Sequence, residues 1–583
     1  MVVRSQGEAT DSTRQGRRLP PGTGLVSLAL LAGGIVFGAM RLTWPSAPIP
    51  RLERHLLQTS DMVLALLVAV STFMVAWSFS QGARREDPVS IRHRWRLFLG
   101  LWAVLATPLL LWWVGEWPGH FHSDARQSLL VSSELRVEPW LSTLWGIWAH
   151  AIHRATGQFP FLSLFNVVVL AALLADFFSL LLHLGLSRRV GGLFIALVVT
   201  SVPLGLLAIN LSHDTINALL RLGIALILLR VMSRRALTGQ PGLTPVTLPS
   251  LVLLTALATL LRGDSLALLL YVPAVLLLTR QVRVGVAVAV LLGTMALNQG
   301  VRRGIEPRLV EPQPERAERY GLSLLLNPLG FMVANNYVTA TPEEDKATIQ
   351  ALVAYSCLRE RYVLEESPCY WFDLQPPITA EKMARLRSLV FRMARDNPAL
   401  MLSNRLVTFA GILGLSSRAT FPVMGQRETT PPEHVYSANG AELLRRHGLE
   451  PSRAPQALAR VTHWLREASI PYKQGRWLYF PWNGLPALLL TAWLVSRWRT
   501  LPLSAVVAGA ILAPAALVFV AAPASHPSYV TDLWVFGYLA VPLAWFEARV
   551  LRARTSSRNS SAGGEGGSAG AVDAAPAHLS HHG

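Results

Sequence analysis

Long apolar runs constrain this chain more than any other feature of its sequence. Of its 583 residues, 51% are hydrophobic and only 15% are charged, whereas soluble domains average about 25% charged residues. Runs long enough to cross the roughly 30 Å hydrocarbon core of a bilayer recur along the chain. The sequence therefore predicts an all-α polytopic membrane protein with about twelve transmembrane helices. We expect them at residues 24–40, 62–80, 97–114, 161–185, 190–209, 215–232, 248–261, 265–279, 284–298, 477–496, 501–522 and 530–548.

The distribution of arginines predicts the orientation of these helices. Basic short loops stay on the cytoplasmic side of a membrane. If the N-terminus is cytoplasmic, arginine clusters fall inside at 84–96, 188–189, 230–235, 280–283, 497–499 and 549–558. The short outside loops 210–214 and 523–529 then carry no arginine, and only 41–61 departs from the rule. We therefore expect a multi-pass membrane protein with both termini in the cytoplasm and with the run 24–40 retained as its first helix.

This topology also predicts a domain organisation. The outside segment 299–476 is long enough to fold on its own, and we expect an extracytoplasmic domain of mixed secondary structure. Within it, Asn404–Leu415 is apolar but too short to span, which favours an interfacial or buried helix. The other predicted parts are disordered cytoplasmic tails at 1–20 and 551–583, two N-terminal helices in 21–96, a transmembrane core at 97–298 with an outer loop at 115–160, and C-terminal helices in 477–550.

Two bulk features limit the function classes. The formal net charge is +18, but most short-loop arginines serve orientation, so we do not expect nucleic acid as a partner. The chain has two cysteines, Cys357 and Cys369, both in the predicted extracytoplasmic segment. A disulfide between them is the natural interpretation in an oxidising compartment, and two free thiols are the alternative. No Cys/His spacing resembles a zinc site.

Ionisable residues gather where the predicted helices meet the outer face. Asp124 follows the run 97–114 and has His122, Arg126 and Gln127 beside it. His213 and Asp214 precede the run 215–232, Arg262 and Asp264 lie between two further runs, and His526 lies between the last two. Such groups at membrane depth are costly and tend to be functional. The alternative is structural, because Asp214 and Asp264 could each cap a helix.

Two further features have structural interpretations. Asp176 is the residue that we read as charged within a span interior, and we expect it to pair with a polar group inside the bundle. The tryptophans near the end of the run 97–114 fit an interfacial aromatic belt, with a sugar-stacking surface as the alternative. Trp140–Ile152 has the pattern of an amphipathic helix that lies along the outer interface.

Four segments, in this order, resemble the GT-C superfamily of membrane glycosyltransferases. These segments are Trp117-Pro-Gly-His-Phe-His-Ser-Asp124-Ala-Arg-Gln127, Asn210-Leu-Ser-His-Asp214-Thr-Ile-Asn217, Leu261-Arg262-Gly-Asp264 and Asp396-Asn-Pro-Ala-Leu-Met-Leu-Ser-Asn-Arg405. The first two resemble the acidic positions of the first and second outer loops of bacterial members, and the resemblance covers roughly residues 97–550. The chain departs from the family at Glu138-Pro139, where members often carry His-Pro, and at Ser528-Tyr529, where many carry Arg-Tyr.

The resemblance implies an inverting transfer of a hexose or pentose from a polyprenyl-phosphate donor, on the outer face of a bacterial inner membrane. The acceptor would be an envelope glycan, lipid or protein. Asp124 would be the general base, with Asp214 as a second catalytic candidate. Arg262 or Arg126 would neutralise the phosphate leaving group. His122, Gln127, His213 and Asp264 complete the expected substrate-binding set, and a divalent metal held by Asp124 or Asp214 is compatible with the sequence.

A polytopic transporter or lipid flippase is the alternative function. The sequence shows neither repeated halves nor two interrupted apolar runs in matching positions, which transporters of this kind often carry. A structural membrane subunit is a third class that the sequence leaves open.

Overall fold

The computed structural model describes residues 88–117, 119, 142–239, 242–309, 316–362, 369, 373–414, 455–469 and 484–551. The predicted helices at 24–40 and 62–80 and both predicted tails lie outside the described residues, except for Leu551. The segment 120–141 also lies outside them, so the structure does not place His122, Asp124, Arg126 or Gln127.

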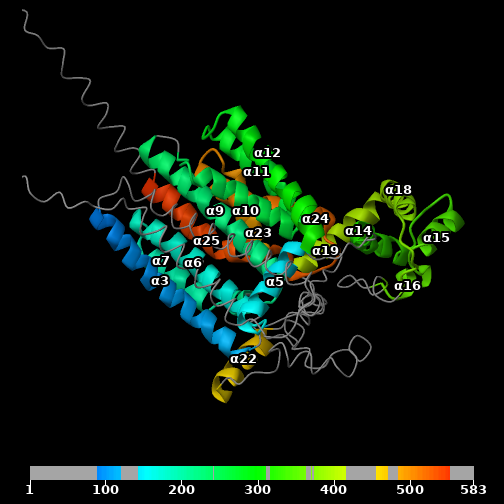
Figure 1. Ribbon diagram of the computed structural model, residues 1–583, viewed down its shortest axis with the longest axis horizontal. Helices are drawn as coiled ribbons and strands as arrows, with labels where there is room; N and C mark the ends of the chain where they lie inside the picture. The colour runs from blue at the N-terminus through cyan, green and yellow to red at the C-terminus, as the bar shows by residue number, and fades with distance from the viewer. Residues whose placement is uncertain are drawn as a thin grey trace, which may run out of the picture.

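The described chain is a bundle of apolar helices with a smaller helical unit beyond one end (Figure 1). Each helix of the bundle falls on one of the apolar runs of the sequence. They are α3 (Pro88–Gly115), α6 (Phe161–His183), α7 (Arg188–Val199), α8 (Val202–Ala208), α9 (His213–Thr238), α10 (Thr247–Leu261), α11 (Leu266–Leu278), α12 (Val284–Gly300), α23 (Leu485–Ser496), α24 (Pro502–Ala521) and α25 (Thr531–Trp545).

The prediction of about twelve transmembrane helices is supported in its coarser part, a helical chain with several candidate spans. Six described segments are long and apolar enough to cross a bilayer, and α7 with α8 makes a seventh if that bent pair is one span. The helices of the remaining predicted runs, α10, α11 and α23, are shorter than a full span. The predicted run 190–209 is broken by a 61° bend. Ser201 caps α8 by accepting from the Leu204 amide, and Pro203 has no amide proton with which to continue a helix from α7.

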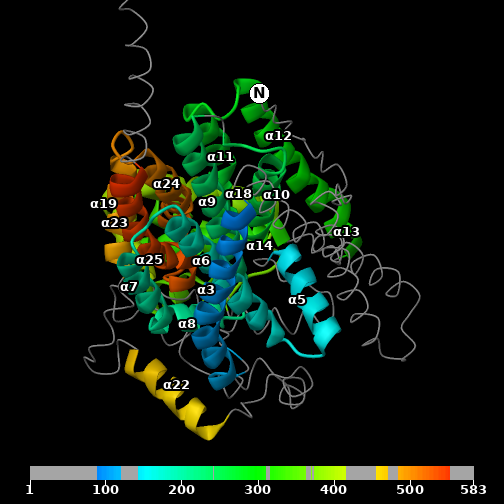
Figure 2. The ribbon, with the colours of Figure 1, turned by 90° about the vertical axis from the view of Figure 1, so that its left-hand side faces the viewer.

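Burial separates the centre of the bundle from its rim. In α9, 78% of the most apolar window is buried, and this helix packs against α6, α10, α24 and α25. The corresponding buried share of α3 is 22%, and Leu99, Val104 and Leu111 on this helix are exposed. An exposed apolar face of this size fits contact with lipid. The helix α3 therefore lies at the rim, which Figure 2 also shows.

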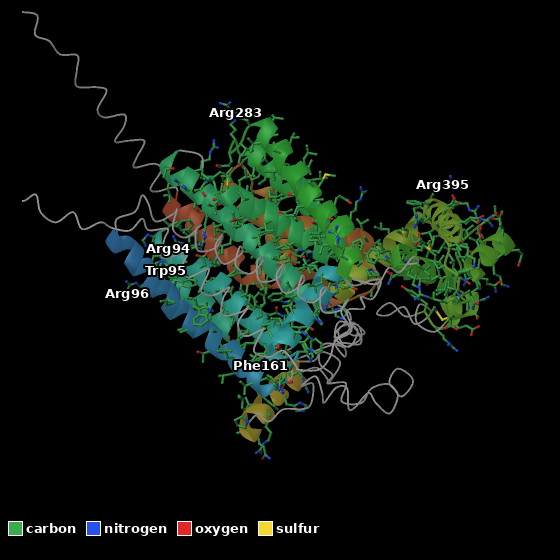
Figure 3. The ribbon with its side chains drawn as sticks, in the orientation of Figure 1. Arg94, Trp95, Arg96, Phe161, Arg283 and Arg395 are labelled. Atoms are coloured by element: carbon green, nitrogen blue, oxygen red, sulfur yellow. A yellow bond between two sulfur atoms is a disulfide. The ribbon has the colours of Figure 1, made fainter. Side chains whose placement is uncertain are left out.

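The two ends of the bundle carry separate polar clusters. At one end, which we call the Asp176 end, Asp176 pairs with Arg94 at 3.5 Å and with Arg230. Figure 3 shows Arg94 there, while Phe161 at the start of α6 lies at the other end. This confirms the expected pairing role of Asp176. At the other end, which we call the Asp214 end, α3, α8 and α10 finish and α6, α9 and α25 begin.

The predicted extracytoplasmic domain is helical rather than mixed where the structure describes it. A single isolated β-bridge joins Val353 and Leu374, and an apolar core holds the helices together. This unit is helical because its apolar residues recur every three or four positions, as Met383, Leu386 and Val390 do, and such spacing places them on one face of a helix. The helices are α14 (Arg316–Ala334), α15 (Pro342–Gln350), α16 (Tyr355–Glu360), α18 (Ala380–Asp396) and α19 (Pro398–Ile412). A disulfide joins Cys357 and Cys369, the pairing that their isolation in the sequence predicts.

The helix α19 connects this unit to the bundle. Arg405 donates to the carbonyl oxygens of Val520 and Ala522 at 3.2 and 3.1 Å, next to the end of α24. The same helix exposes Leu402 and Leu406 on its other side. The prediction of a short, non-spanning helix over Asn404–Leu415 is therefore confirmed, with one face buried and the other exposed.

Candidate functional site

Asp214 lies in the first turn of α9 at the Asp214 end. Ser212 caps this helix by accepting from the Asp214 amide at 3.0 Å, so the carboxylate itself is not needed as the cap. One carboxylate oxygen contacts the Arg262 guanidinium and lies 3.3 Å from the His213 ring. The other accepts from the Ser528 hydroxyl group. Both oxygens of Asp214 are thus engaged by donors that come from three different parts of the chain.

Arg262 is held at the junction of α10 and the short helix η1 (Gly263–Ser265). Its guanidinium lies between Asp214 and Asp264, with 3.2 Å between Nη2 and the nearer Asp264 oxygen. It also stacks over the Tyr529 ring, 4.3 Å from the ring centroid. Burial lowers the pKa of Arg262, but Asp214 and Asp264 raise it by more, so the pKa lies above its ordinary value. This side chain is a fixed, fully charged cation.

A second arginine supports the first from inside the bundle. Arg221 follows Asp214 by two helical turns on α9 and pairs with Asp264. It also lies 3.5 Å from Asp532 on α25, and its Nε donates to the Ser265 hydroxyl group at 3.0 Å. Asp264 is therefore a bridge between two arginines rather than only a helix cap.

Arg221 and Asp532 are not among the site residues that the sequence predicts. We read Asp176 as the charged residue within a span interior, yet both of these residues also lie inside predicted apolar runs. The signal was available, because a charged residue in an apolar run is costly unless it has a partner. Their pairing across two helices could not be read from the sequence, since they are 311 positions apart along the chain.

The cluster is closed on the bundle side and partly open on the other. The side chains of Arg221, Asp214, Asp532 and Asp264 are 2, 2, 3 and 8% exposed. Those of Arg262 and His213 are 13 and 16% exposed. Arg262 and His213 are therefore the more exposed side chains of the cluster, and the Arg262 guanidinium is already engaged by Asp214 and Asp264.

The segment that contains Asp124 starts and ends at the same end of the bundle. Gly119 lies against the α8–α9 junction, where a Cβ on Gly119 would be 2.8 Å from the Ile209 carbonyl oxygen. Ser142 donates to the Leu260 carbonyl oxygen at 2.8 Å, two residues before Arg262. The sequence-predicted site residues that the structure describes, His213, Asp214, Arg262 and Asp264, are brought together.

The predicted amphipathic helix after this segment is α5 (Thr143–Thr156). Trp145 is 1% exposed and packs with Phe159, Leu162 and Leu261, so much of the apolar face of α5 contacts α6 and α10. The expected position of this helix along the outer interface stays a prediction.

The described residues do not fit a divalent metal around Asp214. No group of three or more His, Cys, Asp and Glu residues in the described part of the chain could hold one. A cation would also have to displace the Arg262 guanidinium from the Asp214 carboxylate.

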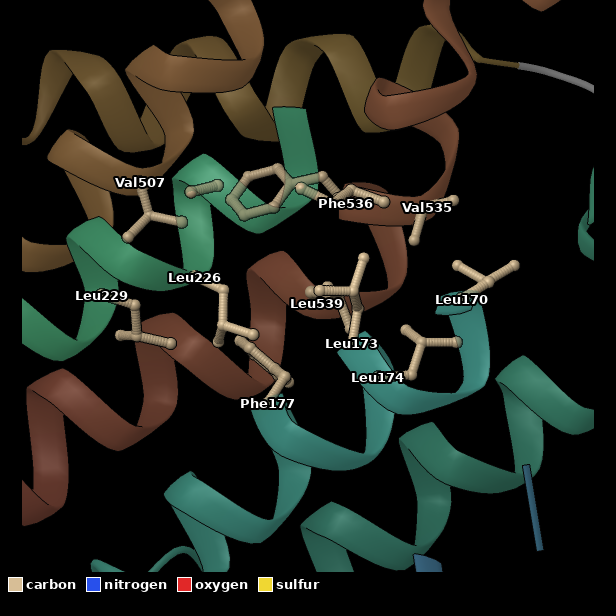
Figure 4. Close-up of a pocket in the computed structure, with 12 residues that line it drawn as sticks. Leu170, Leu173, Leu174, Phe177, Leu226, Leu229, Val507, Val535, Phe536 and Leu539 are labelled. Carbon is tan, nitrogen blue, oxygen red and sulfur yellow. The ribbon is translucent and has the colours of Figure 1, made fainter. Parts of the chain in front are cut away.

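An apolar pocket lies deeper in the bundle, away from the cluster. Figure 4 shows side chains of α6, α9, α24 and α25 around it, among them Leu174, Phe177, Leu226 and Phe536. All of the lining residues are Leu, Val, Ala or Phe, so the pocket offers no group that binds a sugar or a phosphate.

The chain matches no protein-family model, no curated protein and no solved structure.

Proposed function

We propose that this protein is an integral membrane glycosyltransferase that moves a sugar from a polyprenyl-phosphate donor to an envelope acceptor. The reaction takes place at the Asp214 end, on the outer face of a bacterial inner membrane. The observation that carries the proposal is Arg262, a fixed and partly exposed cation between two carboxylates at the end of an apolar bundle. A lipid-linked phosphate would place its charge at this depth while its polyprenyl chain stays in the bilayer.

Arg262 would act on the leaving group. When the acceptor oxygen attacks the anomeric carbon, the bond between that carbon and the phosphate oxygen breaks, and negative charge grows on the polyprenyl phosphate. A preorganised guanidinium lowers the energy of this charge without reorganising in the transition state. Members of the GT-C superfamily often carry an Arg-Tyr pair where this chain has Ser528-Tyr529. Arg262 stacks on Tyr529 here, so an arginine from another element supplies the cation beside this tyrosine.

Asp124 would act as the general base that takes the proton of the acceptor hydroxyl. Asp214 is less suited to this step, because Arg262, His213 and Ser528 already engage its oxygens. We therefore assign to Asp214 the positioning of Arg262, and the proton transfer to Asp124.

Sugar transfer from defined polyprenyl-phosphate sugars, measured in reconstituted membranes and normalised to inserted protein, tests these roles. Loss of a general base costs about 10²–10⁴-fold in rate, so Asp124→Asn should lose that much activity. Arg262→Lys keeps the charge but loses the planar fork and the ring stacking, and should lower the rate at a given amount of donor. Glu381→Gln removes an exposed carboxylate of the helical unit and is the matched control, with activity unchanged. Wild-type activity of Asp124→Asn would make Asp214 the leading candidate for the base.

The bend between α7 and α8 is the observation that favours a transporter or flippase, because broken helices line transport sites in many carriers. The same vesicles distinguish the two functions. A transferase changes the chemistry of the acceptor, whereas a flippase moves labelled polyprenyl-phosphate sugar between leaflets without forming a new glycosidic bond. Movement without transfer, unaffected by Asp124→Asn, would replace the transferase by the flippase.

A further inference from the structure

The helix α22 (Gln456–Ser469) crosses the end of α3 at the Asp214 end (Figures 1 and 2). Arg466 on α22 pairs with Glu116 at 2.7 Å, and the two side chains are only 5 and 2% exposed. Gly115 gives Thr462 room to approach, since a Cβ on Gly115 would lie 2.6 Å from the Thr462 side chain. A buried ion pair and a close helix contact therefore fix α22 on the bundle.

Only part of the apolar side of α22 faces the protein, where Leu465 packs against the core of the bundle. At 100° per residue, Val461 and Trp464 fall on one arc, with Leu458 and Leu465 beside them. Thr462 and Arg466, which contact α3, lie outside this arc. Val461 and Trp464 are 54 and 56% exposed. Val461 and Trp464 thus form an apolar stripe that the described chain leaves exposed.

The surface next to this stripe identifies what covers it. Leu99, Val104 and Leu111 form the exposed apolar side of α3, which faces lipid if α3 spans the membrane. The helix α22 lies at the end of this side, at the level where the bilayer gives way to water. A helix with an exposed tryptophan on its apolar arc and an exposed arginine, Arg460, one turn away at the edge of that arc is typical of the membrane interface.

We propose that α22 is an interfacial helix that places Val461 and Trp464 in the headgroup–acyl boundary of a phospholipid bilayer beside α3. Through the Glu116–Arg466 pair it anchors the point where the chain leaves α3. The inference rests on membrane insertion of the bundle and is independent of glycosyl transfer, so its failure would leave the proposed reaction untouched.

Depth-dependent quenching tests this proposal in the full chain. Val461→Cys would carry an environment-sensitive fluorophore, in protein reconstituted into phosphatidylcholine–phosphatidylglycerol vesicles. Gln456→Cys, an exposed position about 140° from Val461 on the helix, is the matched control, and the wild-type chain reports labelling of Cys357 and Cys369. Lipids with a quencher near the headgroup should quench the Val461 probe several-fold more than the Gln456 probe, and iodide should show the reverse order. Ala457→Cys, on the same arc, repeats the measurement if Val461→Cys does not insert.

Two results would overturn the proposal. Equal access of iodide to the Val461 and Gln456 probes would mean that the apolar stripe faces water. Protection from iodide without quenching by the lipids would mean that a protein surface, rather than the bilayer, covers the stripe.

Discussion

Replacement of Arg221 by methionine should destabilise the bundle more than the replacement of any exposed charged residue. Arg221 is 1% exposed and is the shared partner of Asp264 and Asp532. Met fills a similar volume but leaves two carboxylates buried without this cation. Removing one partner of a buried ion pair typically costs about 3–5 kcal/mol, and we expect a loss of at least about 3 kcal/mol in the free energy of unfolding.

The matched control uses the same substitution on the surface. Arg385 pairs with Glu381 one helical turn away, and the side chains are 71 and 75% exposed. Exposed pairs of this kind contribute about 0.3–0.5 kcal/mol, so Arg385→Met should change the stability by no more than that. Both variants can be measured by reversible unfolding in mixed micelles, with far-ultraviolet circular dichroism as the readout.

A compensating variant tests the role of these charges even if Arg221→Met is too unstable to purify. Adding Asp532→Asn to Arg221→Met neutralises the carboxylate whose ion pair in the described chain is with Arg221, whereas Asp264 keeps its contact with Arg262. Replacing both partners of a buried pair is often nearly neutral, so this double variant should recover much of the lost stability. A loss below about 1 kcal/mol in the single variant, or no recovery in the double variant, would show that the cluster is not held together by these charges.

Three further predictions address other parts of the chain. Non-reducing mass mapping should find Cys357 linked to Cys369, and Cys357→Ser should destabilise the helical unit by about 2–3 kcal/mol; full thiol labelling of unreduced protein would refute this. Glu547 accepts hydrogen bonds from two backbone amides at the start of α24, both at 2.8 Å. Glu547→Ala should therefore lower the free energy of unfolding by about 1–2 kcal/mol in the micelle assay, and an unchanged unfolding midpoint would contradict this. Reporter fusions should place residue 90 and the C-terminus in the cytoplasm and residues 130 and 400 outside, and a cytoplasmic residue 400 would contradict both the topology and the proposed reaction.

The helices of the bundle could be predicted from the sequence because their cause is local. An apolar run must satisfy its backbone groups internally once it enters lipid, and a helix does so within one segment. The same reasoning applies to α19, whose apolar part is too short to span. The break between α7 and α8 depends on a local signal too, Ser201 followed by Pro203, but its effect competes with an otherwise continuous apolar run.

The candidate site could be predicted only in part. Asp214, Arg262 and Asp264 stand at the ends of apolar runs, and ionisable residues at such positions are conspicuous in a sequence. What each of them binds is a tertiary property. Arg262 reaches Asp214 across 48 positions, and Ser528 reaches it across 314, because α9, α10 and α25 have their ends at one level of the bundle.

The sequence by itself determined that this chain is helical and apolar and has several candidate transmembrane helices. The length of an apolar run and the hydrogen bonding of its backbone are both properties of a single segment. Only the tertiary structure decided that Arg221 and Asp532, which lie inside those segments, belong to the same charged cluster as Asp214. The physical reason is that a buried charge is stable only beside its counter-charge, and helix packing selects which distant residues become neighbours.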